Sequence, residues 1–112
     1  MAVSRSDTLD HDLASRFVFD RAAIAHFCQH HHIRRLALFG SVLRDDFRPG
    51  SDVDVLVDFE PGHPVGLIRL AGIERELGSL MGRRIDLRTA ADLSRYFRDE
   101  VVEAARELYA AA

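Results

Sequence analysis

Two aspartates, Asp52 and Asp54, lie two residues apart at the start of the clearest strand pattern in the sequence, DVDVLVDFE over 52–60. Alternation along a strand puts both carboxylates on one face, opposite the valines. Neighbouring carboxylates repel each other and are costly to bury, whereas Mg²⁺ accepts hard oxygen ligands on a shared face. The pair therefore predicts a metal site. The alternative is that Asp52 caps a turn while Asp54 is solvated.

A glycine and a serine, Gly40 and Ser41, precede this pair by twelve residues, where the apolar run RRLALFG ends and a short helical stretch is expected. Glycine permits close approach of the backbone, and the free N–H groups at a helix start bind phosphate. The serine hydroxyl adds another donor. A phosphate cradle that faces a carboxylate pair is what metal-assisted nucleotide chemistry needs.

A third carboxylate, Asp86, alternates with Ile85 and Leu87 in the predicted strand RRIDLRT over 83–89. If this strand pairs beside the second one, Asp86 reaches the face that carries Asp52 and Asp54. Three carboxylates could then hold two cations, one on nucleotide phosphates and one that lowers the pKa of an attacking hydroxyl. The alternative is an exposed strand residue balanced by neighbouring arginines.

Hydrophobic periodicity predicts the elements that position these groups. We expect strands over 34–40, 52–60 and 83–89, and helices over 21–32 after the N-cap Asp20, over 41–47, over 66–81 before Gly82, and from Ala90 onward. An apolar stripe near the end of the last helix, part of which could face a partner, comprises Val101, Val102, Ala105, Leu108 and Tyr109. The order predicts a small layered α/β (α+β) domain with three evident strands, whose spatial order does not follow from the pattern.

A length of 112 residues predicts one domain, over 16–112, after a polar lead-in over 1–15. The net charge of −3 provides no basic field for nucleic acid or an anionic membrane. All fifteen basic residues are arginines, which excludes the phosphate-loop lysine and Schiff-base chemistry. A single cysteine, no secretory signal pattern and no long apolar run favour a cytoplasmic protein.

The run HFCQHHH over 26–32 invites a zinc interpretation, because His26 and His30 stand one helical turn apart with Cys28 between them. We favour histidines that interact with the dipole at a helix C-terminus, and a small core residue at position 28.

The G-S pair followed after ten residues by D-x-D resembles the signature of the DNA polymerase β nucleotidyltransferase superfamily. The stretch LFGSVLRDDFRPGSDVDVLVDFEPG is similar to the minimal nucleotidyltransferases (MNT) that are paired with HEPN-domain toxins. The resemblance, which runs over 34–109, implies a nucleotidyltransferase fold with a small mixed sheet flanked by helices. It also implies site roles, namely nucleotide binding by Gly40, Ser41 and Arg44, and catalysis and binding of two Mg²⁺ ions by Asp52, Asp54 and Asp86.

Arg44 falls where many relatives carry the arginine of A-R-G, although its neighbours here are Leu43 and Asp45. No residues are left for an acceptor-binding domain, so we expect a partner to supply the acceptor. The resemblance implies that AMP passes from ATP to a hydroxyl of a HEPN toxin, which makes the chain an antitoxin. The alternatives are an antitoxin that acts by binding alone and a transferase with a small-molecule acceptor. Direct binding of nucleic acid is not expected.

Overall fold

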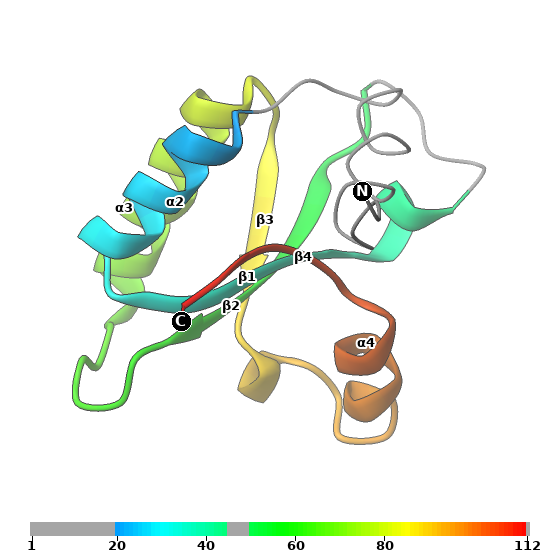
Figure 1. Ribbon diagram of the computed structural model, residues 1–112. Coiled ribbons are helices and arrows are strands. Elements are labelled where there is room, and N and C mark those ends of the chain that lie inside the picture. Colours follow the sequence, from blue (N-terminus) through cyan, green and yellow to red (C-terminus); the bar gives the residue numbers. More distant parts are fainter. Residues whose placement is uncertain (1–19, 45–49, 112) are drawn as a thin grey trace, which may run out of the picture.

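A four-stranded sheet forms the centre of the computed structural model, which describes residues 20–44 and 50–111 (Figure 1). Its spatial order is β3-β2-β1-β4. The strands span Ile33–Phe39 (β1), Val53–Phe59 (β2), Ile85–Arg88 (β3) and Arg106–Ala110 (β4). Strand β1 pairs antiparallel with β2 and with β4, and β2 pairs parallel with β3. This mixed sheet flanked by helices confirms the predicted fold class.

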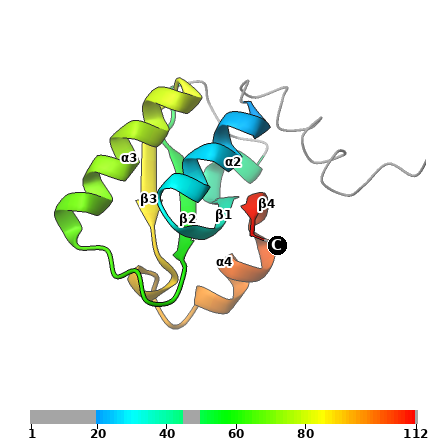
Figure 2. The same cartoon turned by 60° about the vertical axis from the view of Figure 1, so that its left-hand side comes forward.

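Two helices, α2 (Arg21–His30) and α3 (Leu67–Met81), lie side by side over one face of the sheet (Figures 1 and 2). They bury Ile24, Phe27, Ile73 and Leu77 against the strands. Helix α4 (Arg98–Ala104) covers part of the opposite face, where Ala105 and the partly buried Val102 pack with Leu56 and Ala37 of the sheet. The sheet is therefore the middle layer of three.

The ends of the two long helices follow the predicted signals. The Asp20 carboxylate accepts hydrogen bonds from the N–H groups of Ala22 (2.9 Å) and Ala23 (3.3 Å), as an N-cap does. Gly82 ends α3 in the left-handed region, with φ +66°, which glycine adopts without steric cost. Both helices begin and end within two residues of the predicted bounds.

The alternation predicted for β2 is present in the sheet. Val53, Val55 and Val57 are buried in the core beneath α2 and α3, while Asp54 and Asp58 are half-buried and belong to the other face. Leu56 shares that face and is buried by its contacts beneath α4. The face that carries the aspartates is thus apolar at its centre and acidic toward the ends of the strand.

The prediction of continuous helix from Ala90 onward is wrong. The segment contains a 3₁₀ turn (Ala90–Asp92), the helix α4, and then the strand β4, so the sheet has four strands and not three. Leu108 is 2% exposed between Glu107 and Tyr109, a period of two that the predicted helical stripe obscured. Pairing with β1 satisfies backbone groups along an otherwise open sheet edge, and this tertiary gain outweighs the helix propensity of an alanine-rich stretch.

The predicted lead-in over 1–15, and residues 45–47 of the predicted helical stretch 41–47, lie outside the described residues. The described part of that stretch is a 3₁₀ turn (Gly40–Leu43). The domain bounds stay a prediction. Within 20–44 and 50–111, no helix is long and apolar enough to cross a membrane.

Candidate active site

The candidate site lies where β1 ends and β2 begins. These strands are antiparallel, and Phe39, the last residue of β1, is the register partner of Asp54. Gly40 and Ser41 follow at once and open the 3₁₀ turn, so the turn lies directly beside the Asp54 side chain. The structure therefore brings the predicted phosphate-binding residues against one of the predicted metal ligands.

The contact between Gly40 and Asp54 explains the need for glycine. Gly40 has φ +75°, and a Cβ placed on it would lie 2.3 Å from Oδ2 of Asp54. Real Cβ atoms essentially never come this close to another atom. A carboxylate oxygen occupies the space that any other residue would fill.

Asp54 and Asp86 are brought together by strand register. Strands β2 and β3 run parallel, and the two aspartates are direct partners on adjacent strands. Both are half-buried, and both project to the face opposite their buried neighbours, Val53 and Val55 in β2 and Ile85 and Leu87 in β3. The pairing of the third strand beside the second, on which the expected position of Asp86 depended, is present.

The electrostatics of Asp54 reflect this crowding. Burial raises the pKa of its carboxyl group, and the nearby carboxylates of Asp86 and, more weakly, Asp52 raise it further. The backbone N–H of Ser41 hydrogen-bonds to the carboxylate and lowers the pKa, as does the guanidinium of Arg88. A cation bound here would therefore reduce the electrostatic cost of the ionised Asp54 carboxylate.

Asp52 and Asp86 each have an arginine partner. Asp86 accepts two hydrogen bonds from Arg88, at 3.0 Å from Nε to Oδ1 and 3.4 Å from Nη2 to Oδ2. Asp52 precedes β2 in an exposed position, with Oδ1 3.7 Å from Nη1 of Arg84. The three aspartates lie at the same end of the neighbouring strands β2 and β3, but their carboxylate oxygens are not close enough together to bind one ion directly. Over residues 20–44 and 50–111, the one group of three metal-ligating side chains within 4.8 Å lies elsewhere.

The donor set nonetheless suits Mg²⁺ in its chemistry. Carboxylate oxygens are the ligands that this ion takes from proteins, and it commonly retains waters that bridge longer gaps. Asp54 and Asp86 are adjacent, and Asp52 lies exposed two residues before Asp54. Arg44, the remaining predicted site residue, is exposed where the 3₁₀ turn ends, and its backbone N–H donates to the carbonyl of Ser41 (2.9 Å).

Glu74 is a supporting residue that the sequence analysis missed. It belongs to α3, and its Oε2 accepts a hydrogen bond from the backbone N–H of Leu87 at 2.8 Å. Leu87 follows Asp86 in β3, an edge strand, so Glu74 fixes the strand that carries the third aspartate. A carboxylate beside the buried Ile73 in the α3 pattern was the only signal in the sequence that could have indicated it.

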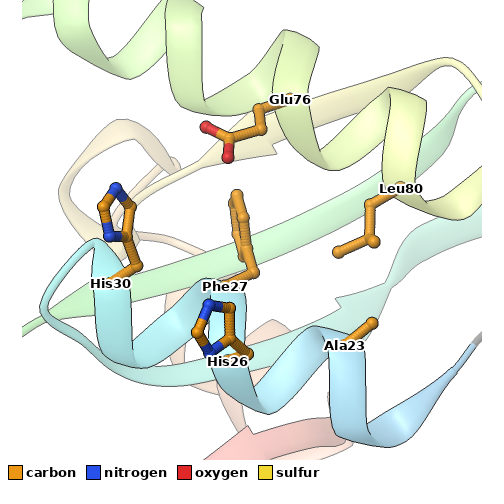
Figure 3. A pocket seen from close by; sticks show the side chains of 6 residues that line it. All are labelled: Ala23, His26, Phe27, His30, Glu76 and Leu80. Carbon is orange, nitrogen blue, oxygen red and sulfur yellow. The ribbon is translucent and has the colours of Figure 1, made fainter.

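A pocket also lies between α2 and α3, away from the aspartates (Figure 3). It is lined by Ala23, His26, Phe27, His30, Glu76 and Leu80. His26 and His30 flank Phe27 there, while Cys28 is fully buried in the core. This separation agrees with the interpretation of Cys28 as a core residue and not as a metal ligand shared with these histidines.

The chain matches the nucleotidyltransferase domain family over residues 21–108, a stretch that includes β1, the turn, β2, α3 and β3. The chain belongs to this family. The fold, the Gly40–Ser41 turn and the paired aspartates define it as a nucleotidyltransferase domain, as the resemblance implied.

Two curated relatives carry more specific names. The protein adenylyltransferase MntA of Thermococcus cleftensis is 40% identical over 55 residues, which cover 49% of this chain and 54% of that protein. A candidate protein adenylyltransferase of Methanocaldococcus jannaschii, MJ1217, is 35% identical over 57 residues, which cover 51% and 56%. The chain therefore spans little more than half the length of these two relatives.

Three solved structures share the fold. A candidate minimal nucleotidyltransferase has a TM-score of 0.62 at 31% identity, over 94% of this chain and 97% of that one. A toxin–antitoxin complex with AMP-PNP gives 0.65 at 19% identity, over 83% and 75%. A complex of a tri-AMPylated Shewanella oneidensis HEPN toxin with an MNT antitoxin gives 0.58 at 19% identity, over 81% and 70%.

Proposed function

We propose that this chain transfers AMP from ATP to a hydroxyl group of a HEPN toxin and thereby acts as its antitoxin. The observation that carries the proposal is the arrangement of residues where β1 ends and β2 begins. There the Gly40–Ser41 turn adjoins Asp54, and Asp54 is paired with Asp86. Membership of the nucleotidyltransferase domain family supports this reading of the site. The adenylyltransferase relatives support AMP as the transferred group.

In the proposed reaction, the backbone N–H groups and hydroxyl of the Gly40–Ser41 turn bind the nucleotide phosphates, and Arg44 adds a positive charge nearby. Asp52, Asp54 and Asp86 would hold two Mg²⁺ ions, which when bound neutralise phosphate charge and lower the pKa of a coordinated hydroxyl. The acceptor oxygen forms a bond to the α-phosphorus of ATP, the bond to the bridging oxygen breaks, and pyrophosphate leaves.

In the proposed reaction, Asp86 accepts the proton that the acceptor hydroxyl loses. Arg88 donates to both of its oxygens, and we propose that one of these hydrogen bonds is exchanged for a bond to metal or proton. Arg88 then remains near the developing negative charge. This exchange of partners is part of the proposed mechanism.

The proposed partner is a HEPN toxin, because structures with the same fold were solved in toxin–antitoxin complexes, one of them with a tri-AMPylated HEPN toxin. The net charge of −3 does not favour a nucleic-acid acceptor. We place the reaction in the cytoplasm, where ATP and Mg²⁺ are available.

The test is a measurement of the intact mass of the protein encoded by the neighbouring gene after it is co-expressed with this chain. We expect a gain of whole AMP units with the native chain and none with the Asp52→Asn, Asp54→Asn double variant. Asp58→Asn is the matched control, because Asp58 lies on the same face of β2 but is paired with Arg34 at the other end of the strand. No mass gain with the native chain would refute the transfer.

Neutralisation by binding alone is the second candidate function. It is favoured by the ion pairs Asp86–Arg88 and Asp52–Arg84, since these arginines compensate the carboxylates without any metal. Growth of cells that co-express the toxin separates the two functions. Full rescue by the double variant, with no AMP on the toxin, would establish binding as the mechanism.

A further inference from the structure

A second group of ligating side chains lies at the opposite end of the β1–β2 pair from the aspartates. It consists of His32, Glu60 and His63, whose ligating atoms all lie within 4.8 Å of one another. His32 immediately precedes β1 and Glu60 immediately follows β2, next to the register pair Ile33 and Phe59. Phe59 lies five positions after Asp54 along β2, a span of about 17 Å.

The backbone holds this group in place. The N–H of Glu60 donates to the carbonyl of His32 at 2.8 Å, which fixes the two residues opposite each other. The N–H of His63 donates to the carbonyl of Glu60 at 3.3 Å and closes the turn Glu60-Pro61-Gly62-His63. Gly62 has φ +85°, so the turn has proline and a positive-φ glycine at its two central positions, as a type II turn requires. The first and last residues of this turn, Glu60 and His63, therefore each carry a side chain that can bind a metal ion.

The three side chains lie close together although His32 and Glu60 do not form a hydrogen bond. The rings of His32 and His63 stack with centroids 4.0 Å apart and an interplanar angle of 8°. Nδ1 of His32 lies 3.8 Å from Oε2 of Glu60, beyond hydrogen-bond distance. His32 also has φ +56°, which is unusual for a residue other than glycine. The ligating atoms of the three groups thus lie within reach of one common ion.

From this geometry we infer that His32, Glu60 and His63 bind a metal ion such as Zn²⁺, independently of the nucleotidyltransferase site. Two imidazoles and one carboxylate are a donor set that Zn²⁺ takes with a water in the fourth position. Imidazole ligands select against Mg²⁺, which distinguishes this site from the aspartates. Coordination would bring the ligand atoms to about 3.3 Å from each other, and we expect the exposed His63 ring to turn out of the stack to allow it.

A bound ion would add a link between two chain segments that are already joined by a backbone hydrogen bond and by the stacked rings of His32 and His63. His32 lies in the turn between α2 and β1, and Glu60 and His63 lie in the connection between β2 and α3. The ion would therefore hold the start of β1 against the end of β2, and we expect it to raise the midpoint temperature of unfolding.

The experiment is a titration of the untagged chain with Zn²⁺ in competition with a chromogenic chelator, followed by Co²⁺ substitution and visible spectroscopy. We expect one ion per chain and a tetrahedral Co²⁺ spectrum. His63→Ala should weaken Zn²⁺ binding by about tenfold or more, since it removes one of three ligands from an exposed turn. His32→Asn should weaken Zn²⁺ binding by a similar factor, because it removes another ligand. The variant should stay folded, because asparagine tolerates the positive φ of this position.

The matched control is the His26→Ala, His30→Ala variant, which removes two histidines one helical turn apart in the pocket of Figure 3. It should bind Zn²⁺ as the native chain does, and so should the Asp52→Asn, Asp54→Asn variant. The inference would be overturned if the native chain did not bind Zn²⁺, if folded His63→Ala bound it with unchanged affinity, or if either control variant lost the binding. Circular dichroism establishes that each variant is folded.

Discussion

Gly40 and Asp54 are in such close contact that residue 40 cannot carry a side chain without displacing the carboxylate. A Cβ at this position would lie 2.3 Å from Oδ2 and 3.2 Å from Cγ of Asp54. The turn proposed to bind phosphate and the strand residue proposed to bind metal therefore depend on each other's exact placement. A change in one must alter the other.

Gly40→Ala should lose transfer activity and stability together. The positive φ alone should cost at least about 1 kcal/mol of unfolding free energy. Displacement of Asp54 should slow AMP transfer about 100-fold, because misplacement of a reacting group by 1 Å has effects of that size. Toxin AMPylation rates and thermal melts measure the two effects.

The control for Gly40→Ala is Gly62→Ala. Gly62 also has a positive φ, of +85°, but a Cβ there meets no atom within 4 Å. This variant should share the backbone cost and keep the transfer rate. Equal rates for the two variants would show that the contact with Asp54 is unimportant for activity.

Asp54→Asn should stabilise the metal-free protein at pH 7. Since the folded-state pKa of Asp54 is raised above its ordinary value of 3.8, the native state keeps a proton that the unfolded chain releases. Stability contributed by this group falls as pH rises from 3.8 through the folded pKa, and the deficit persists at neutral pH. Asparagine removes it, for a gain of at most a few degrees, since about 1 kcal/mol moves the Tm of such a domain by roughly 4–8 °C.

Thermal melts with and without Mg²⁺ check this prediction. Mg²⁺ should raise the Tm of the native chain and have less effect on Asp54→Asn. Asp58→Asn, which loses a pair with Arg34 on the same face, should be neutral or slightly destabilised. A lower Tm for metal-free Asp54→Asn than for the native chain at pH 7 would contradict the electrostatic account.

Glu74 should support activity through the strand that carries Asp86. Glu74→Ala leaves the part-buried N–H of Leu87 without its acceptor and should cost about 1–3 kcal/mol. Glu74→Gln keeps an acceptor oxygen and should cost less. If Glu74 keeps Asp86 in position for the reaction, the alanine variant should lose AMP transfer and the glutamine variant should retain it.

Glu103→Ala, an exposed change on α4, is the comparison for Glu74→Ala and should stay within about 0.5 kcal/mol of the native chain. Chemical denaturation gives the free energies of all three variants. Equal stability of Glu74→Ala and Glu103→Ala would exclude a structural role for the hydrogen bond to Leu87.

Cys28 should be unreactive until the chain opens. It is fully buried, and burial raises the pKa of its thiol to about 12, so roughly one molecule in 10⁴ would carry the thiolate at pH 8. A colourimetric thiol reagent should react with it only in denaturant. Ser79→Cys, on an exposed position of α3, should add one thiol that reacts at once. Rapid labelling of native Cys28 would contradict this.

The local parts of the site could be predicted from the sequence because they depend on neighbours in the chain. The alternation of Asp54 with buried valines and the glycine-serine turn after an apolar run follow from strand geometry and glycine chemistry alone. The direct pairing of Asp54 with Asp86 needed the additional assumption that β3 lies beside β2. That assumption is confirmed, but periodicity could not supply it.

The parts that could not be predicted depend on distant segments. Strand β4 forms because β1 offers an open edge, and a stretch rich in alanine, arginine and glutamate does not indicate that edge. Glu74 points at a strand thirteen residues later in the chain. The His32, Glu60 and His63 group forms only when the start of β1 lies beside the end of β2, and the histidine run HFCQHHH does not indicate that pairing.

The order of pairing in the sheet bears on how the domain folds. Strands β1 and β2 join residues close in sequence, such as Phe39 and Asp54, whereas β1 and β4 join Arg35 to Ala110. Loop-closure entropy favours the nearer pairing first. We therefore expect a folding chain that has formed only the β1–β2 hairpin to hold Gly40 against Asp54 already, so that the contact between the proposed phosphate-binding turn and the proposed metal ligand precedes the complete sheet.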